Sequence, residues 1–330
     1  MSEIESETAP GAAGRDGEQA PLGVPIHIRF WLSLRRGVLR RLIPVWAMSL
    51  ILSLFAVYML DTLLAHHADP IVKLWSPLFF STALISLVCM YVDSTLGMGY
   101  GTTLTPILLL VGYDPLAVVP ALLVSQWLAG IAAGVSHQTA GNIDLSAKSP
   151  HLKVAMVLAA CGMVGALLAV RVAVSIDQNH LTLLIGGLVL IIGVVILATR
   201  GRRFRFSWRK IVVLGLVASF NKGLSAGGYG PIVTGGQILS GVGGRQAIGI
   251  TALSEGLTCL VGTMAFLASG QVHDLSVAFP LVLGAVCSVP VSAYTVRRMA
   301  IRWLTSLIAT ITIVLGAVTL IKAIRDLYIA

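Results

Sequence analysis

Long apolar runs follow one another along this chain, and their succession limits it to a fold that spans a membrane. With 56% hydrophobic and 11% charged residues, the chain has too little polar surface to cover its apolar side chains in water. In a bilayer the backbone groups of each segment must be paired within the protein, which favours helices. The sequence therefore predicts an all-α polytopic membrane protein. Its apolar runs cover approximately residues 42–64, 76–98, 102–112, 115–137, 152–175, 181–199, 210–226, 231–241, 246–269, 276–296 and 303–324.

Basic residues lie mainly in short loops between these runs, which accounts for the formal net charge of +9 without a nucleic-acid partner. Lys and Arg beside membrane helices mark the cytoplasmic side. Arginines precede the first run and cluster at 200–210, whereas the turns near 177–180 and 270–274 contain no Lys or Arg. We therefore expect a protein of the cell inner membrane, embedded in the lipid bilayer, with a cytoplasmic N-terminus.

The composition divides the chain into five segments. Residues 1–28 are rich in Glu, Gly, Ala and Pro without an apolar period, which is typical of a disordered tail. We expect a basic segment, the first transmembrane helix and an outer loop at 29–75, and a basic cytoplasmic loop at 200–210. The remaining segments, 76–199 and 211–330, are predicted to be two transmembrane repeats.

A glycine-rich segment occurs twice in the chain. Residues 99–141 align with 228–270 without a gap, and nine of the 43 positions are identical where about four are expected by chance. The identities include the Gly-Tyr-Gly that opens each copy, and Ser125 with Ser254. Glycines and hydroxyls serve backbone geometry and polar contacts, so the repeat predicts a functional site.

Each Gly-Tyr-Gly is followed by an apolar run of only eleven residues, at 102–112 and 231–241. A helix of this length rises about 16 Å, which is about half of the hydrocarbon core. Broken helices in corresponding places of two halves are typical of transporter binding sites. Because the basic loops place the start of one repeat outside and the start of the other inside, we predict two inverted-topology repeats with broken or half-length helices at the centre, plus one extra N-terminal transmembrane helix.

Three ionisable side chains lie deep in apolar context, namely Asp93, Lys222 and Glu255. A charge at bilayer depth costs about 2.5 to 3.5 kcal/mol, so each should face protein or water. Lys222 is predicted to attract an anion, and Asp93 or Glu255 to accept a coupling proton. The alternative is a static ion pair, for instance between Lys222 and Glu255, that only locks two helices together.

The starts of the two half-helices, near residues 102–103 and 232–233, present free backbone amides and positive dipole ends that favour an anion. Hydroxyl and amide side chains nearby add hydrogen-bond donors. The glycines have an alternative role, since they also let helices pack closely. The candidate substrate-binding residues are Gly99, Tyr100, Gly101, Thr102, Thr103, Ser125, Gln126, Asn221, Lys222, Gly228, Tyr229, Gly230 and Ser254.

Two motifs leave other functions open. Gly-Tyr-Gly also occurs in potassium filters, and residues 223–227 fit the GxSxG nucleophile elbow around Ser225. A cation channel and an intramembrane hydrolase are therefore the alternatives to a transporter. The four cysteines and the scattered histidines show no metal-ligand spacing. We expect a transporter of a small anionic substrate and not an enzyme, with no metal and no cofactor.

The two glycine-rich segments, each followed by a short helix and then a long helix that carries a serine, resemble the TauE/SafE sulfite exporter family of anion transporters. The resemblance covers about residues 77–325. It implies transport of sulfite, thiosulfate, sulfoacetate or other small organic sulfonates and carboxylates. The matching elements are residues 97–101, Pro106, Gly112 and 141–144 in the first half, and 227–230, Gly241 and 270–273 in the second.

The chain departs from the family's pattern inside these motifs. Tyr100, Tyr229 and Met98 replace glycines, and Gly235 stands where a proline is expected in the second half. Tyrosines at these places can change the size of the pocket or donate hydroxyls to the ligand. The resemblance therefore allows a substrate other than sulfite.

Overall fold

A computed structural model of the chain describes residues 77–199, 208–239, 242–272, 275–296 and 301–329, together with a few isolated positions between 43 and 55. The predicted tail at 1–28 and the loop residues 200–207 lie outside the described residues. The same holds for the basic segment and for nearly all of the expected first transmembrane helix.

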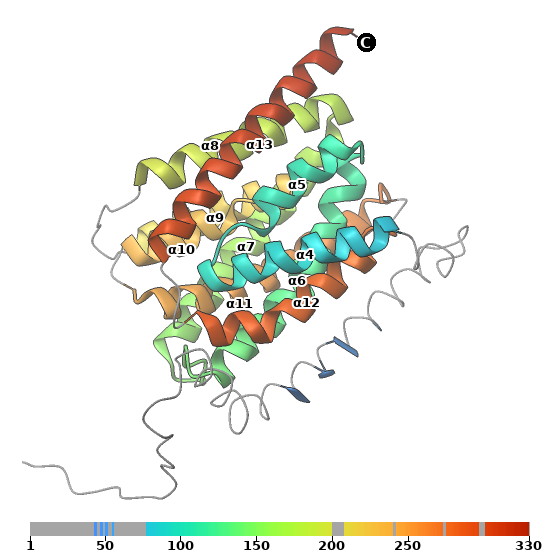
Figure 1. Cartoon of the computed structure of the whole chain (residues 1–330). Coiled ribbons are helices and arrows are strands. Elements are labelled where there is room, and N and C mark those ends of the chain that lie inside the picture. Colours follow the sequence, from blue (N-terminus) through green and yellow to red (C-terminus); the bar gives the residue numbers. More distant parts are fainter. Residues whose placement is uncertain are drawn as a thin grey trace, which may run out of the picture. The chain divides into compact units, whose positions relative to one another are not determined.

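The described part of the chain is built of helices and contains no strand (Figure 1). The first half contributes α4 (Pro77–Leu96), α5 (Tyr100–Val111), α6 (Pro115–Thr139), α7 (Pro150–Ser175) and α8 (Gln178–Thr199). The second half contributes α9 (Trp208–Ser225), α10 (Tyr229–Leu239), α11 (Gly244–Ala268), α12 (Ala278–Thr295) and α13 (Ile301–Ile329). The prediction of an all-α fold is thus confirmed.

Seven of the described helices are long and apolar enough to cross a bilayer, whereas α5 and α10 have only 12 and 11 residues. Large apolar side chains on the long helices face outward, for example Leu84 on α4, Leu168 on α7 and Ile191 on α8. In water such exposure would be costly, but in lipid it is the expected outer surface. These features confirm a multi-pass membrane protein.

The helices of the two halves correspond in order. Helices α5 and α10 begin at Tyr100 and Tyr229, and α6 and α11 begin at Pro115 and Gly244, so both pairs differ by the 129 positions of the sequence alignment. Five helices in the first half therefore match five in the second. This arrangement is consistent with two repeats, while their inverted orientation across the bilayer stays a prediction.

The halves interleave through pairs made of one helix from each. Helix α4 packs against α12 and α9 packs against α7, which are equivalent pairs in the two halves, while α6 packs against α11 and α8 against α13. Figure 1 shows α4 alongside α12 and α8 alongside α13. The centre of the bundle is consequently lined by both halves.

The half-helices begin earlier than the sequence indicates. Their first residues are Tyr100 and Tyr229, not residues 102 and 231, because the Tyr-Gly of each Gly-Tyr-Gly already belongs to the helix. The break lies just before it, where Gly97, Gly99, Ala226 and Gly228 have positive φ angles. Glycine adopts this conformation without steric cost, whereas Ala226 adopts it against its Cβ.

Candidate functional site

The two helix breaks touch each other in the middle of the bundle. A methyl group at Gly101 would lie 1.7 Å from the carbonyl oxygen of Ala226, and one at Gly230 would lie 2.0 Å from the carbonyl oxygen of Gly97. These are equivalent contacts, since each glycine of one half meets the break of the other. Only glycine permits backbones to approach so closely, so in this conformation no ligand fits between the breaks.

Hydroxyl groups hold the crossing from both sides. Thr105 donates a hydrogen bond of 2.6 Å to the carbonyl oxygen of Ser225, and its repeat equivalent Thr234 lies 3.0 Å from the carbonyl oxygen of Gly97. Carbonyls at the end of a helix lack partners within that helix. The two threonines satisfy them from the opposite half.

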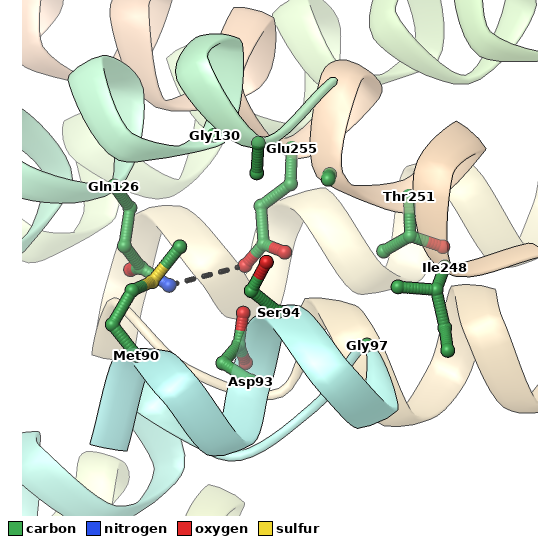
Figure 2. A pocket seen from close by; sticks show the side chains of 11 residues that line it. Met90, Asp93, Ser94, Gly97, Gln126, Gly130, Ile248, Thr251 and Glu255 are labelled. Atoms are coloured by element: carbon green, nitrogen blue, oxygen red, sulfur yellow. Dashed lines mark hydrogen bonds between the residues drawn. The ribbon is translucent and has the colours of Figure 1, made fainter. Parts of the chain in front are cut away.

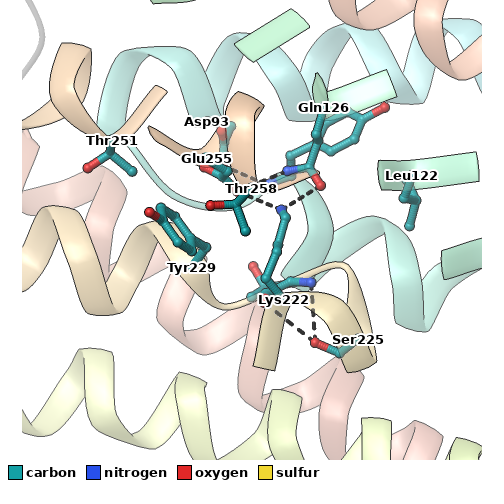
Figure 3. A network of polar contacts seen from close by, with 12 residues as sticks. Asp93, Leu122, Gln126, Lys222, Ser225, Tyr229, Thr251, Glu255 and Thr258 are labelled. Atoms are coloured by element: carbon teal, nitrogen blue, oxygen red, sulfur yellow. Dashed lines mark hydrogen bonds and ion pairs between the residues drawn. The ribbon is translucent and has the colours of Figure 1, made fainter. Parts of the chain in front are cut away.

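Four polar side chains meet beside the crossing, and they come from four helices (Figure 3). The ammonium of Lys222 donates to the Oε1 atoms of Gln126 and Glu255, each at 2.5 Å. The amide of Gln126 donates to the same Glu255 oxygen at 3.2 Å. Lys222 is 1% exposed and Glu255 is 6% exposed, so the ion pair considered from the sequence is present and buried.

Asp93 is the fourth member of this cluster. It accepts a hydrogen bond of 3.0 Å from the backbone N–H of Tyr100, so its carboxylate lies at the N-terminus of α5. Among the described residues it forms no ion pair, although it is only 7% exposed. One backbone amide at the start of α5, that of Tyr100, is thus taken by the protein's own carboxylate, which the positive end of the helix stabilises.

A small cavity lies between α4, α6 and α11, with room for about one water molecule. Figure 2 shows the carboxylates of Asp93 and Glu255 directed towards it, with Ser94 between them. Its walls thus carry two acidic groups from two helices. The lining residues are Met90, Asp93, Ser94, Gly97, Gln126, Gly130, Ala133, Ile248, Thr251, Ala252 and Glu255.

The other predicted site residues surround this cluster and do not line the cavity. Gly99, Gly101, Thr102, Gly228 and Gly230 are buried in the crossing, and Thr103 is half-buried. Asn221 donates a hydrogen bond of 2.9 Å to the carbonyl oxygen of Gly227 and so holds the second break. The structure brings all of these residues to the two helix breaks.

Both tyrosines of the repeat are fully buried, and their hydroxyls contact serines. The Tyr100 hydroxyl lies 2.9 Å from Ser86 Oγ and 2.8 Å from Ser125 Oγ, while Tyr229 donates to Ser254 at 3.1 Å. In this conformation neither hydroxyl reaches the cavity. The tyrosines therefore join each half-helix to the long helix that follows it.

We expect Tyr229→Phe to lower stability by about 1 kcal/mol, because one hydrogen bond is lost, and Tyr100→Phe to cost more because two serines lose a partner. Thermal unfolding in detergent measures both. If the hydroxyls instead contact the substrate, each variant will lose affinity for it without a matching loss of stability.

Residues 82–319 match the sequence profile of the family described as "Sulfite exporter TauE/SafE". The chain belongs to the TauE/SafE sulfite exporter family. A curated relative, the "Probable membrane transporter protein YtnM" of Bacillus subtilis (strain 168), is 27% identical over 261 residues, which is 73% of this chain and 82% of the relative. No solved structure matches the chain. Family membership confirms the resemblance and identifies the protein as a membrane transporter.

The motifs behind the alternative functions have other structural roles in this TauE/SafE protein. The Tyr-Gly of each Gly-Tyr-Gly starts α5 or α10, so the segment is not an extended ladder of carbonyls as in a potassium filter. Ser225 donates to the carbonyl oxygen of Asn221 and accepts from the N–H of Gly227, which is the pattern of a helix end. Neither segment has the geometry that its motif would need.

Sequence reasoning missed two polar residues of the cavity wall, Ser94 and Thr251. Each lies on the same helix as a carboxylate that the sequence indicated. Ser94 follows Asp93, and Thr251 lies one turn before Glu255. Residues four apart share a helix face. Following the helix face from each buried charge would have found Thr251, although nothing in the sequence shows that the faces of α4 and α11 meet.

Proposed function

We propose that the protein is a secondary transporter that moves a small anion, such as sulfite, thiosulfate or an organic sulfonate or carboxylate, across the cell inner membrane. The observation that carries this proposal is the position of Lys222. Among the side chains that the structure describes it is the only buried Lys or Arg, and it lies where the two repeats meet. An ammonium at this depth is costly unless it serves a ligand or a partner.

The ion pair with Glu255 does not by itself explain Lys222. A buried ion pair stabilises a protein no better than well-packed apolar residues do, since both charges lose their hydration. The cluster moreover contains a second carboxylate, Asp93, that has no cation of its own among the described residues. Such a cluster contributes little to stability. It is suited to an ammonium that exchanges one anionic partner for another.

A proton links the carboxylates to the anion in this proposal. The ammonium has three N–H donors, and two of them point to Gln126 and Glu255. Protonation of Glu255 removes its negative charge and leaves Lys222 free to pair with a substrate anion. Binding of a proton and binding of the anion therefore favour each other, and Asp93 is a second group that can take the proton.

The small size of the cavity supports alternating access. It holds about one water molecule, so an anion with three oxygens enters only when α4, α6 and α11 separate. We propose that the two repeats rock against each other at the helix breaks and open the cluster to one side of the membrane at a time. The N-terminus is proposed to lie on the cytoplasmic side.

Ligand-induced thermal stabilisation of the detergent-purified full-length protein tests the anion site. A ligand at 100 times its dissociation constant stabilises the folded state by about 2.7 kcal/mol, because it binds the native protein alone. We expect a rise in melting temperature with at least one of sulfite, thiosulfate, methanesulfonate or glycolate, and no such rise in Lys222→Ala. Stabilisation by potassium alone, whichever anion accompanies it, would contradict the proposal and favour a cation channel.

A further inference from the structure

We infer that the central cluster carries one proton with each monovalent anion, and that it thereby selects monoanions over dianions. This inference rests on the proposed function and narrows its substrate class. It follows from counting the charged groups of the central cluster, and from the high cost of leaving a net charge inside the membrane.

The count needs every titratable group around the cluster. Asp93 on α4, Lys222 on α9 and Glu255 on α11 are the groups that change the charge. Tyr100 on α5, Tyr229 on α10 and Cys259 on α11 are also buried there, and Cys89 on α4 lies half-buried one turn before Asp93. These residue types are neutral at neutral pH. Gln126 on α6 is uncharged. The cluster therefore holds at most one positive charge and two negative charges.

A histidine lies behind the cavity wall but adds no charge to the count. His137 on α6 is fully buried, and its Nε2 atom lies 3.0 Å from the carbonyl oxygen of Ser94. Its Nδ1 atom lies 3.0 Å from the Asn142 amide nitrogen, which also donates to Ala293. An amide nitrogen can only donate, so Nδ1 accepts, Nε2 carries the hydrogen and the ring is neutral.

The empty cluster is neutral when its two carboxylates share one proton. With both ionised, Lys222 balances only one of them and the net charge is −1. Figure 2 shows Asp93 and Glu255 facing the same small cavity, where like charges repel and favour a shared proton. When the transporter without substrate returns to the other side of the membrane, its two carboxylates therefore carry one proton between them.

The loaded cluster is neutral when both carboxylates are protonated and Lys222 pairs with a monoanion. Loading then adds one proton and one negative charge. A dianion would leave a net charge of −1 even with both carboxylates protonated, because the described residues offer no second buried Lys or Arg and His137 is neutral. Lys322 on α13 is only partly buried, and its ammonium is engaged by the carbonyl oxygens of Leu109 and Leu110.

Transport by the full-length protein in proteoliposomes, with a pH dye inside and the membrane potential set by potassium and valinomycin, tests this count. We expect one proton per anion for methanesulfonate and glycolate, and a flux that changes less than about twofold between 0 and 100 mV. Movement of one net charge would bias the flux up to about 50-fold over that range. Methanedisulfonate and malonate, the matching dianions, should move at least about tenfold more slowly than the monoanions.

The outcomes separate this inference from the proposed function. Dianions that move as fast as monoanions, or a flux that follows the potential, would overturn the inference while the protein remains an anion transporter. If sulfite and the four probes all enter no faster than into protein-free liposomes, the proposed function fails and the inference fails with it.

Neutralising the carboxylates provides a second, independent test. In Asp93→Asn or Glu255→Gln one carboxylate remains, so we expect a slower flux that still brings one proton per anion. In the double variant the empty cluster has a charge of +1, and anion flux should lose its proton and follow the potential. A single variant that moves anions without protons would contradict the count. Should the double variant fail to fold, the single variants and the voltage dependence of the wild-type flux still test the charge count.

Discussion

Replacing Lys222 with alanine is expected to abolish anion transport while the protein still inserts into the membrane. The substitution removes the only buried Lys or Arg side chain among those described and leaves Glu255 with Gln126 as its partner. Breaking a buried charge pair typically costs about 3 to 5 kcal/mol. A loss of about 3 kcal/mol in the binding of the substrate anion lowers its affinity at least about 100-fold. A transport assay would then detect no flux above background.

A matched control separates lost function from lost stability. The double variant Lys222→Met with Glu255→Gln keeps the volume of both side chains and removes both charges, so the bundle should be about as stable as the wild type. We expect this variant to melt normally and to transport nothing. Lys153→Ala, at an exposed position on α7, should behave as the wild type. Unimpaired flux in Lys222→Ala would remove this residue from the mechanism.

The helices of this protein could be predicted from sequence because each apolar run is bounded by residues that end helices. The run at 115–137 became α6 (Pro115–Thr139), which starts at a proline, the residue favoured at the first position of a helix. The starts of the half-helices were placed two residues late. A glycine suggests a break wherever it stands, and only tertiary contacts decide that Gly97 bends the chain whereas Gly101 lies in a helix.

The members of the central cluster could be predicted, but their partners could not. Asp93, Lys222 and Glu255 stand out because a charge in an apolar run needs a reason. That Asp93 binds the start of α5, seven residues later, depends on the path of the chain through the break. That the two breaks touch, and so leave no space for a ligand between them, depends on the packing of one repeat against the other.

The contact between the breaks leads to the second large effect, expected for alanine at Gly101 or Gly230. The added methyl group would lie 1.7 Å or 2.0 Å from a carbonyl oxygen of the opposite half, so backbone must move away from backbone. Overpacking typically costs about 1 to 3 kcal/mol, and these variants should reach the upper end because no flexible side chain can give way. We expect a large fall in melting temperature in detergent, or a failure to accumulate as folded protein.

Gly235→Ala is the matched control, since it lies on the same short helix as Gly230 and no atom lies within 4 Å of its added methyl group. Alanine is the better helix former by about 1 kcal/mol, so this variant should be as stable as the wild type or slightly more stable. Equal melting of all three variants would mean that the breaks do not touch in the protein. Because the contact is reciprocal, Gly101→Ala and Gly230→Ala should cost similar amounts, whereas a difference of several kcal/mol would show that only one break is held by the other half.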